Sequence, residues 1–337
     1  MDTITQAFLG AAIGQAGFRR LGRRATAFGA LCGLLPDFDV LLGIGDDWQG
    51  LITHRGSSHS LLVLPLVAVP VGWLGWRLLG RRGDSKTWIH LAFWGLITHP
   101  LLDVCTTYGT QLLAPLSRRR FSIDAVAILD PLYTLPLIVA VLAGLRRTAD
   151  IERSIRWARA ALSWGLVYLA AGWLWSQHAG AVLTERLATA GFVPVHLRTP
   201  VAPFFPMLRH GVARDADGRV AVATVVPWAP ERGTLAVLPS HSSPRADTVL
   251  ASEHGQTLAW FSDALLTVDR EADGTLWLYD HRYGMFTDPS WTPFRAMLPP
   301  SAPVDALQLR DPGSGGVQID PAAELRAGWA LVVGPSP

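Results

Sequence analysis

Several ionisable side chains in the first half of the chain lie within or beside strongly apolar stretches. His99 and Asp103 are four residues apart in LITHPLLDVC, so a helix would project both from one face, one turn apart. Two residues so spaced can reach a common metal ion, although a buried histidine–aspartate hydrogen bond would give the same pattern. Other histidines and carboxylates occur nearby in the sequence: Asp37 and Asp39 in LLPDFDVLLG, His54 and His59 in HRGSSHS, and Asp130 in AILDPLYTLPL.

Carboxylates in apolar segments need partners. A charged group at the centre of a bilayer costs about 2.5 to 3.5 kcal/mol, so four unpaired carboxylates would cost on the order of 10 kcal/mol. We expect them to share hydrogen bonds, protons, water or a metal. Taken alone, Asp37 and Asp39 would also suit a polar turn at the end of a span, and His54 and His59 would suit ordinary interfacial histidines. His90 falls on roughly the opposite helical face from His99 and is excluded.

Together, the six residues other than Asp130 are a plausible ligand set. Histidine and carboxylate ligands without cysteine are typical of hydrolytic sites that hold Zn²⁺, Mn²⁺ or Fe²⁺, with Zn²⁺ as our first expectation. A metal would activate a water molecule, and Asp39 or Asp130 would take its proton. The two cysteines, Cys32 and Cys105, lie in separate apolar segments and predict neither a disulfide framework nor a Cys-rich metal site.

An arginine run follows the His99 segment. Arg118, Arg119 and Arg120 precede Asp124, and Arg55 lies between the two histidines of HRGSSHS. Guanidinium groups bind phosphate well, so these arginines are candidates for holding an anionic substrate. The alternative is a solvated loop that touches anionic lipid headgroups.

Composition indicates a membrane protein. The chain is 50% hydrophobic with a mean hydropathy of +0.26, and its net charge of +2 does not suggest a nucleic-acid partner. We expect four to six membrane helices. The candidate segments are 1–17, 25–44 (interrupted by Pro36), 61–79, 88–113, 126–145 and 160–177. Arginine-rich loops at 18–24, 77–87 and 146–159 predict these loops to be cytoplasmic and the histidine and carboxylate groups to lie towards the outer side.

The pattern changes near residue 180. Short alternating runs with Asp-Gly turns, in ARDADGRVAVATVV and LLTVDREADGTLWLYD, predict β-hairpins. We therefore divide the chain into a mainly α membrane helix bundle at 1–180 and an extracytoplasmic, antiparallel β-rich domain at 181–337, with a Pro- and Gly-rich loop at 299–316. Asp280 and Arg282 are interpreted as an internal ion pair.

The first 145 residues contain five distinctive stretches in a fixed order: MDTITQAFLG, LLPDFD, HRGSSHS, ITHPLLDVCTTYGTQLLAPLSRRRFSID and ILDPLYTLPL. In these the chain resembles the YdjM-like family of bacterial inner-membrane, metal-dependent hydrolases. A looser resemblance extends to FSDALLTVDREADGTLWLYDHRYG. The resemblance implies polar-ligand roles for the residues Asp37, Asp39, His54, His59, His99 and Asp103. Members commonly carry histidine at the position of Gln6, so position 6 either never was a ligand or marks a reduced site.

The leading hypothesis is an integral inner-membrane, metal-dependent hydrolase that acts on an ester or phosphoester at the outer face of the membrane. Its expected partners are membrane lipids and an anionic, lipid-linked substrate. Two alternatives remain: a membrane protein that binds metal without hydrolysis, and a scaffold whose β domain binds a partner.

Overall fold

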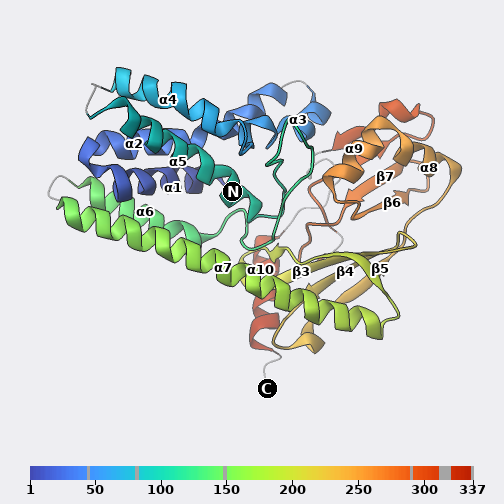
Figure 1. The fold of residues 1–337 in the computed structure, drawn as a ribbon. Helices are drawn as coiled ribbons and strands as arrows, with labels where there is room; N and C mark the ends of the chain where they lie inside the picture. The colour runs from blue at the N-terminus through green and yellow to red at the C-terminus, as the bar shows by residue number, and fades with distance from the viewer. Residues whose placement is uncertain (44–45, 80–82, 147–149, 289–290, 311–319, 335–337) are drawn as a thin grey trace. The chain divides into compact units, whose positions relative to one another are not determined.

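The computed structural model describes residues 1–337 except 44–45, 80–82, 147–149, 289–290, 311–319 and 335–337 (Figure 1). The chain divides into two compact units, Met1–Trp173 and Leu174–Pro337. Parts of the predicted loops lie outside the described residues: Arg81 and Arg82 of the loop 77–87, Arg147 of the loop 146–159, and residues 311–316 of the Pro- and Gly-rich loop.

The first unit is helical. Its α-helices are α1 (Thr3–Phe18), α2 (Arg23–Leu34), α3 (Asp47–Thr53), α4 (Leu64–Leu78), α5 (Ser85–Val104), α6 (Pro131–Leu145) and the part of α7 (Ile151–Thr189) that ends at Trp173. Three short 3₁₀ segments connect them: η1 (Arg19–Leu21), η2 (Leu35–Gly43) and η3 (Ser57–His59).

Helices α1 and α2 pack at very short range because glycines line their contact. Gly10 and Gly14 of α1 face Gly29 and Gly33 of α2, each pair four residues apart. A Cβ atom on Gly10 would lie 2.1 Å from the Gly29 carbonyl oxygen, and one on Gly33 would lie 2.3 Å from that of Gln6. Small residues at this spacing allow two helix backbones to approach closely. The packing places Gly33 of α2 directly beside Gln6 of α1.

Carboxylate caps set where the helices begin. Asp2 accepts from Thr5 N at 3.0 Å, Asp84 from Thr87 N at 2.8 Å, and Asp130 from Leu132 N at 3.0 Å. Each satisfies backbone donors that the first helical turn leaves free. Because Asp130 caps α6 and Pro131 occupies its first turn, α6 is shorter than the predicted segment 126–145. Likewise, α5 ends at Val104, short of residue 113.

Within the described residues, no single helix has both the length and the apolarity to cross a membrane. One pair of segments, Asp47–His59 and Leu64–Leu78, together has the required length and composition, with a bend of 71° between the two segments. Prediction of a helical first half is confirmed.

The second unit contains two antiparallel sheets. In the first, the strand order is β1 (Pro194–Arg198), β3 (Phe205–Asp215), β4 (Val220–Val225) and β5 (Leu235–Leu238), and β2 (Val201–Ala202) also pairs with β3. The second has the order β6 (Leu266–Arg270), β7 (Leu276–Asp280), β8 (Arg295–Leu298) and β9 (Gln308–Arg310). The carboxyl-terminal part of α7 shares an apolar core with the first sheet, including Leu183, Leu187 and Val225.

Both hairpins predicted from Asp-Gly turns are present. Strands β3 and β4 flank the turn at Gly218, and β6 and β7 flank the turn at Gly274; both glycines have positive φ. Helices α8 (Pro244–Ala251), α9 (Glu253–Phe261) and α10 (Pro321–Val333), and the 3₁₀ segments η4 (Pro230–Arg232) and η5 (Val304–Ala306), add helical structure that the strand pattern did not predict. The Asp280–Arg282 ion pair is confirmed at 2.6 Å, with both side chains fully buried.

Candidate metal centre

Four side chains from three segments converge inside the helical unit. Asp37 comes from η2, His59 from η3, and His99 and Asp103 from adjacent turns of α5. One potential ligand atom from each lies within 4.8 Å of the others. His59, His99 and Asp103 are fully buried, whereas the side chain of Asp37 is 20% exposed. We call these four residues the metal cluster.

The distances within the metal cluster suit a small cation. Five pairs are close: His59 Nε2 to His99 Nε2 at 3.0 Å, to Asp103 Oδ2 at 3.2 Å and to Asp37 Oδ1 at 3.5 Å; and His99 Nε2 to Asp37 Oδ1 at 3.2 Å and to Asp103 Oδ2 at 3.4 Å. Four ligands about 2.0 Å from a tetrahedral Zn²⁺ would lie about 3.3 Å apart. The spacing therefore fits an ion of that size.

Hydrogen bonds on the far sides of both imidazoles orient them towards the cluster. His99 Nδ1 lies 2.6 Å from the carbonyl oxygen of Gly33, which only accepts, so Nδ1 carries the proton. His59 Nδ1 lies 2.9 Å from Ser58 Oγ, whose hydroxyl lies 2.5 Å from Asp39 Oδ2. If Ser58 donates to the carboxylate, it accepts from His59. Both Nε2 lone pairs then point inward, as in metal-binding histidines.

Asp103 gives the strongest sign that a cation belongs here. Its Oδ1 accepts from the Met1 amino group and, at 3.1 Å, from Gln6 Nε2. Its Oδ2 is buried without a hydrogen-bond partner, although Arg55 Nε forms an ion pair with it at 3.2 Å without hydrogen-bond geometry. Two inward lone pairs and two carboxylate oxygens thus face one another as four acceptors. Such an arrangement repels itself unless a proton or metal ion lies between them.

Residues 1–179 match the model of the YdjM inner membrane protein family, which is more than half of the chain. The chain belongs to this family.

Among curated relatives, this YdjM family member is similar to "Uncharacterized protein YfhP" of Bacillus subtilis (strain 168), at 25% identity over 154 residues. The match covers 42% of this chain and 45% of YfhP, so the chain spans less than half the length of that relative. No solved structure matches the chain significantly.

In this YdjM family member, Asp39 and His54 lie next to the metal cluster and not within it. Asp39 is 5% exposed and contacts His54 Nδ1 at 2.8 Å, Arg55 N at 2.9 Å and His59 Nδ1 at 3.3 Å. The carboxylate thereby holds HRGSSHS in place around it. The backbone of Arg55 has a φ of 59°, which is unusual outside glycine and is fixed by this contact and by Gln111 N donating to Arg55 O.

Asp130 lies outside the metal cluster. Its carboxylate caps α6 and accepts from the Tyr168 hydroxyl at 2.8 Å. No pattern in the sequence indicated that Gly33 and Ser58 would orient the two histidines of the cluster. The HRGSSHS stretch carries Ser58 next to His59, but a backbone carbonyl such as that of Gly33 leaves no mark in a sequence.

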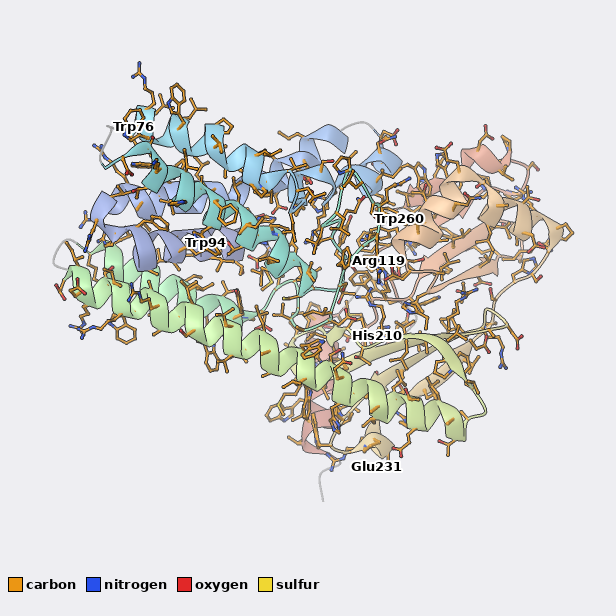
Figure 2. The ribbon with its side chains drawn as sticks, viewed as in Figure 1. Trp76, Trp94, Arg119, His210, Glu231 and Trp260 are labelled. Carbon is orange, nitrogen blue, oxygen red and sulfur yellow. The ribbon has the colours of Figure 1, made fainter. Side chains whose placement is uncertain are left out.

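The four arginines occupy different surroundings. Arg55 is 5% exposed, pairs with Asp103 and lies over the Tyr108 ring at 4.8 Å. Arg119 lies over Phe121 at 5.2 Å, and Arg120 lies over Tyr108 at 5.1 Å. Figure 2 labels Arg119 in the segment that follows α5, at the opposite end of that helix from Trp76.

Arg118 lines a cavity of about 330 Å³ beside the metal cluster. The cavity is also lined by Asp39, Thr53, Ser58 and Gln111. Asp39 and Ser58 both contact His59, which belongs to the metal cluster, so the cavity lies directly beside the cluster. A cationic side chain and a carboxylate thus share a space adjoining the candidate metal ligands.

Proposed function

We propose that this protein is an integral inner-membrane, metal-dependent hydrolase that cleaves an ester or phosphoester in an anionic, lipid-linked substrate. The observation that carries the proposal is the metal cluster itself, four facing acceptors with a buried Asp103 oxygen that lacks a hydrogen-bond partner. Membership of an inner membrane protein family supports the location.

Asp37, His59, His99 and Asp103 would hold the ion, with Zn²⁺ as first choice and Mn²⁺ or Fe²⁺ as alternatives. When bound, such an ion lowers the pKa of a water molecule and polarises a scissile ester. Asp37 is the member of the cluster that solvent reaches, so substrate would approach from its side. Asp103 and the two histidines form the enclosed part of the site.

Asp39 is our assignment for the general base. It lines the cavity and contacts His59, so it can accept a proton from water held between cavity and cluster. The other carboxylate, Asp130, belongs neither to the cavity lining nor to the metal cluster; it caps α6 and accepts from Tyr168, which supports a structural role.

Arg118 would hold the anionic group of the substrate, because it lines the same cavity. Arg55 would neutralise charge at Asp103, whereas Arg119 and Arg120 would shape the loop by stacking on aromatic rings. Nucleic acid is not a proposed partner.

The proposal includes a topology with several membrane passes and an extracytoplasmic second unit. Exposed apolar side chains on α4, α6 and α7 support contact between the helical unit and lipid, for example Leu66 at 72%, Val139 at 59% and Leu166 at 72% exposure. A reporter fused after residue 190 tests the orientation; cytoplasmic activity at that position would contradict it.

A second candidate function is metal binding without hydrolysis. One observation favours it: four protein ligands surround the candidate site, and closed four-ligand sites are typical of structural zinc. In this case the ion would hold η2, η3 and α5 together.

Hydrolysis assays on purified, Zn²⁺-loaded protein separate the two functions. Chromogenic phosphate mono- and diesters and fluorogenic phospholipids would be the substrates, and Asp39→Asn and Arg118→Gln the test variants. Asp84→Asn, a change at the exposed cap of α5, is the matched control. We expect turnover by wild type and the control and loss in the test variants. Absence of turnover in metal-loaded wild type would favour the non-catalytic function, whereas equal turnover in all variants would contradict the roles assigned to Asp39 and Arg118.

A further inference from the structure

A second cavity lies in the helical unit where α6 ends and α7 begins. Its volume is about 330 Å³, and its lining includes Gly144, Arg146, Asp150, Arg153 and Ser154. Arg146 follows the last turn of α6, at the end of the helix opposite its Asp130 cap, and Figure 1 shows α6 beside the first part of α7. We call it the α6–α7 cavity.

The floor of the α6–α7 cavity contains polar atoms without partners. Ser154 is 3% exposed and its Oγ forms no hydrogen bond within the described structure. Beneath it, Gln15 is fully buried and its Oε1 also lacks a partner, although its Nε2 donates to Val141 O at 2.9 Å. A Cβ on Gly144 would lie 2.3 Å from Ser154 Oγ and 2.6 Å from Gln15 Oε1, so glycine keeps this space open. The Ser154 hydroxyl can therefore donate a hydrogen bond to a ligand oxygen that enters the cavity, and Gln15 Oε1 can accept one.

The charges at the cavity favour an anionic ligand. Arg146 and Arg153 contribute two positive charges and Asp150 contributes one negative charge. Asp150 Oδ2 already accepts from Arg153 N at 2.9 Å, so the carboxylate is engaged at the start of α7. The described lining residues carry a net charge of +1, which matches one phosphodiester, and guanidinium groups bind phosphodiesters through paired hydrogen bonds.

An apolar stripe leads away from the cavity along α6. Leu132, Leu135, Val139 and Leu142 are 53%, 54%, 59% and 54% exposed, at intervals of three and four residues that place them on one helix face. The ten helical steps from Leu132 to Leu142 rise about 15 Å. This is half of the roughly 30 Å hydrocarbon core of a bilayer, or the depth of one leaflet. Trp157 of α7, 50% exposed, also lines the cavity, and tryptophan is enriched at membrane interfaces.

We propose that the α6–α7 cavity binds one anionic phospholipid, with its phosphodiester at Arg146, Arg153 and Ser154 and an acyl chain along the stripe on α6. Both halves of such a ligand have a matching surface in the structure: a cationic cavity with a buried donor, and an apolar stripe one leaflet long. This site is independent of the proposed hydrolase activity, because its lining shares no residue with the metal cluster or with the cavity beside it.

Native mass spectrometry of the full chain in detergent tests the site, with added phosphatidylglycerol or phosphatidylcholine. The test variant is Arg146→Gln/Arg153→Gln. The matched control is Arg77→Gln/Arg156→Gln, which removes two exposed arginines that do not line the cavity. We expect wild type and control to retain phosphatidylglycerol at least tenfold more tightly than phosphatidylcholine, and the test variant to lose this preference. Equal retention of the two lipids by wild type, or equal loss in both double variants, would overturn the proposal.

Two further arms identify the source of the phosphate group. Leu135→Ser/Leu142→Ser should weaken retention of phosphatidylglycerol while leaving Arg146 and Arg153 in place, because the stripe contributes apolar contact. Inorganic phosphate at millimolar concentration should not displace the lipid. Displacement by phosphate, together with no effect of the serine variant, would show a site for free anions and contradict the lipid assignment. Unchanged helicity by circular dichroism verifies that each variant is folded.

Discussion

His59 Nε2 and His99 Nε2 lie 3.0 Å apart with both rings fully buried, although 40 residues separate them in the chain. Their other nitrogens are engaged by Ser58 and by the Gly33 carbonyl, so neither ring can turn a donor towards its partner without losing a bond. Two lone pairs at this distance, with Asp37 and Asp103 beside them, need a shared cation. The site thus combines candidate ligand atoms from segments that are far apart in the sequence.

Replacement of Asp39 should affect the site less than replacement of a ligand. Asp39→Asn keeps the size of the side chain but weakens its contacts with His54 and His59. Loss of such an outer carboxylate typically costs about 10- to 100-fold in metal affinity or activity. We expect Zn²⁺ affinity, measured by chelator competition, to fall by no more than this range, and far less than in His99→Ala. A greater loss in Asp39→Asn than in His99→Ala would place the ion at Asp39 instead.

Helix packing should control the metal cluster through Gly33. In Gly33→Ala the new Cβ would lie 2.3 Å from the Gln6 carbonyl oxygen, and the carbonyl of residue 33 anchors His99. Overpacking of this kind costs about 1 to 3 kcal/mol. We expect a lower melting temperature and weaker Zn²⁺ binding.

Gly17→Ala is the matched control for that change, because no atom lies within 4 Å of a Cβ at this position of α1. Replacing an exposed helical glycine with alanine should stabilise the helix by roughly 0.5 to 1 kcal/mol. Equal melting temperatures for the two alanine variants would show that the contact between α1 and α2 is looser than described.

Gln6 offers a test of whether position 6 can supply a ligand. Its Nε2 lies 3.1 Å from Asp103 Oδ1, and the residue is fully buried. An imidazole in this position is within reach of the Asp103 carboxylate, so Gln6→His should hold Zn²⁺ at least as tightly as wild type. Gln6→Leu controls for loss of the amide. Competition with a chelator measures both; weaker binding by the histidine variant than by the leucine variant would exclude a ligand role at position 6.

His281 should make the second unit sensitive to acid. Burial is the main factor that lowers the pKa of this imidazole to about 4 in the folded protein, helped by nearby His210 and opposed by Asp280 and Asp288. In the unfolded chain the pKa is near 6.5. Unfolded chains therefore bind the proton first, and the contribution of neutral His281 to stability is fully present above pH 6.5 and is lost as the pH falls towards 4. The loss is on the order of 3 kcal/mol.

Pulse proteolysis of the full chain between pH 4 and 7.5 measures this dependence, with mass spectrometry of fragments from β6 to β8. His281→Gln should flatten the profile between pH 4 and 6.5. If the wild-type and variant profiles have the same slope, another group causes the acid sensitivity.

Much of the fold followed from local signals. Apolar runs located the main helices of the first unit, Pro36 marked the end of α2, and Asp-Gly turns located two hairpins. The helices α8 and α9 were missed although Ser243 and Ser252 act as their caps, because each is only eight or nine residues long and carries little periodic pattern. The limits of α5 and α6 were predicted less well. Helix α6 begins where Asp130 caps it, and α5 ends at Val104 although the apolar composition continues beyond that residue.

The four residues of the metal cluster were among the six ligands predicted from the sequence, but their arrangement could not be predicted. The spacing of His99 and Asp103 indicated a shared face, and this is confirmed. Asp37 and Asp39 are two residues apart in a 3₁₀ segment, where successive side chains are about 120° apart around the axis, so the two carboxylates point in different directions. Which of them faces the cluster depends on the packing of η2 against α5, and no sequence spacing specifies that contact.

Elemental analysis of the purified full chain tests the central claim most directly. We expect about one divalent ion per chain in wild type and in Asp130→Ala, whose change removes a helix cap and the hydrogen bond from Tyr168, and much less in His99→Ala and Asp103→Ala. Metal-free wild type after incubation with Zn²⁺, Mn²⁺ or Fe²⁺, or equal metal content in all four proteins, would contradict the account.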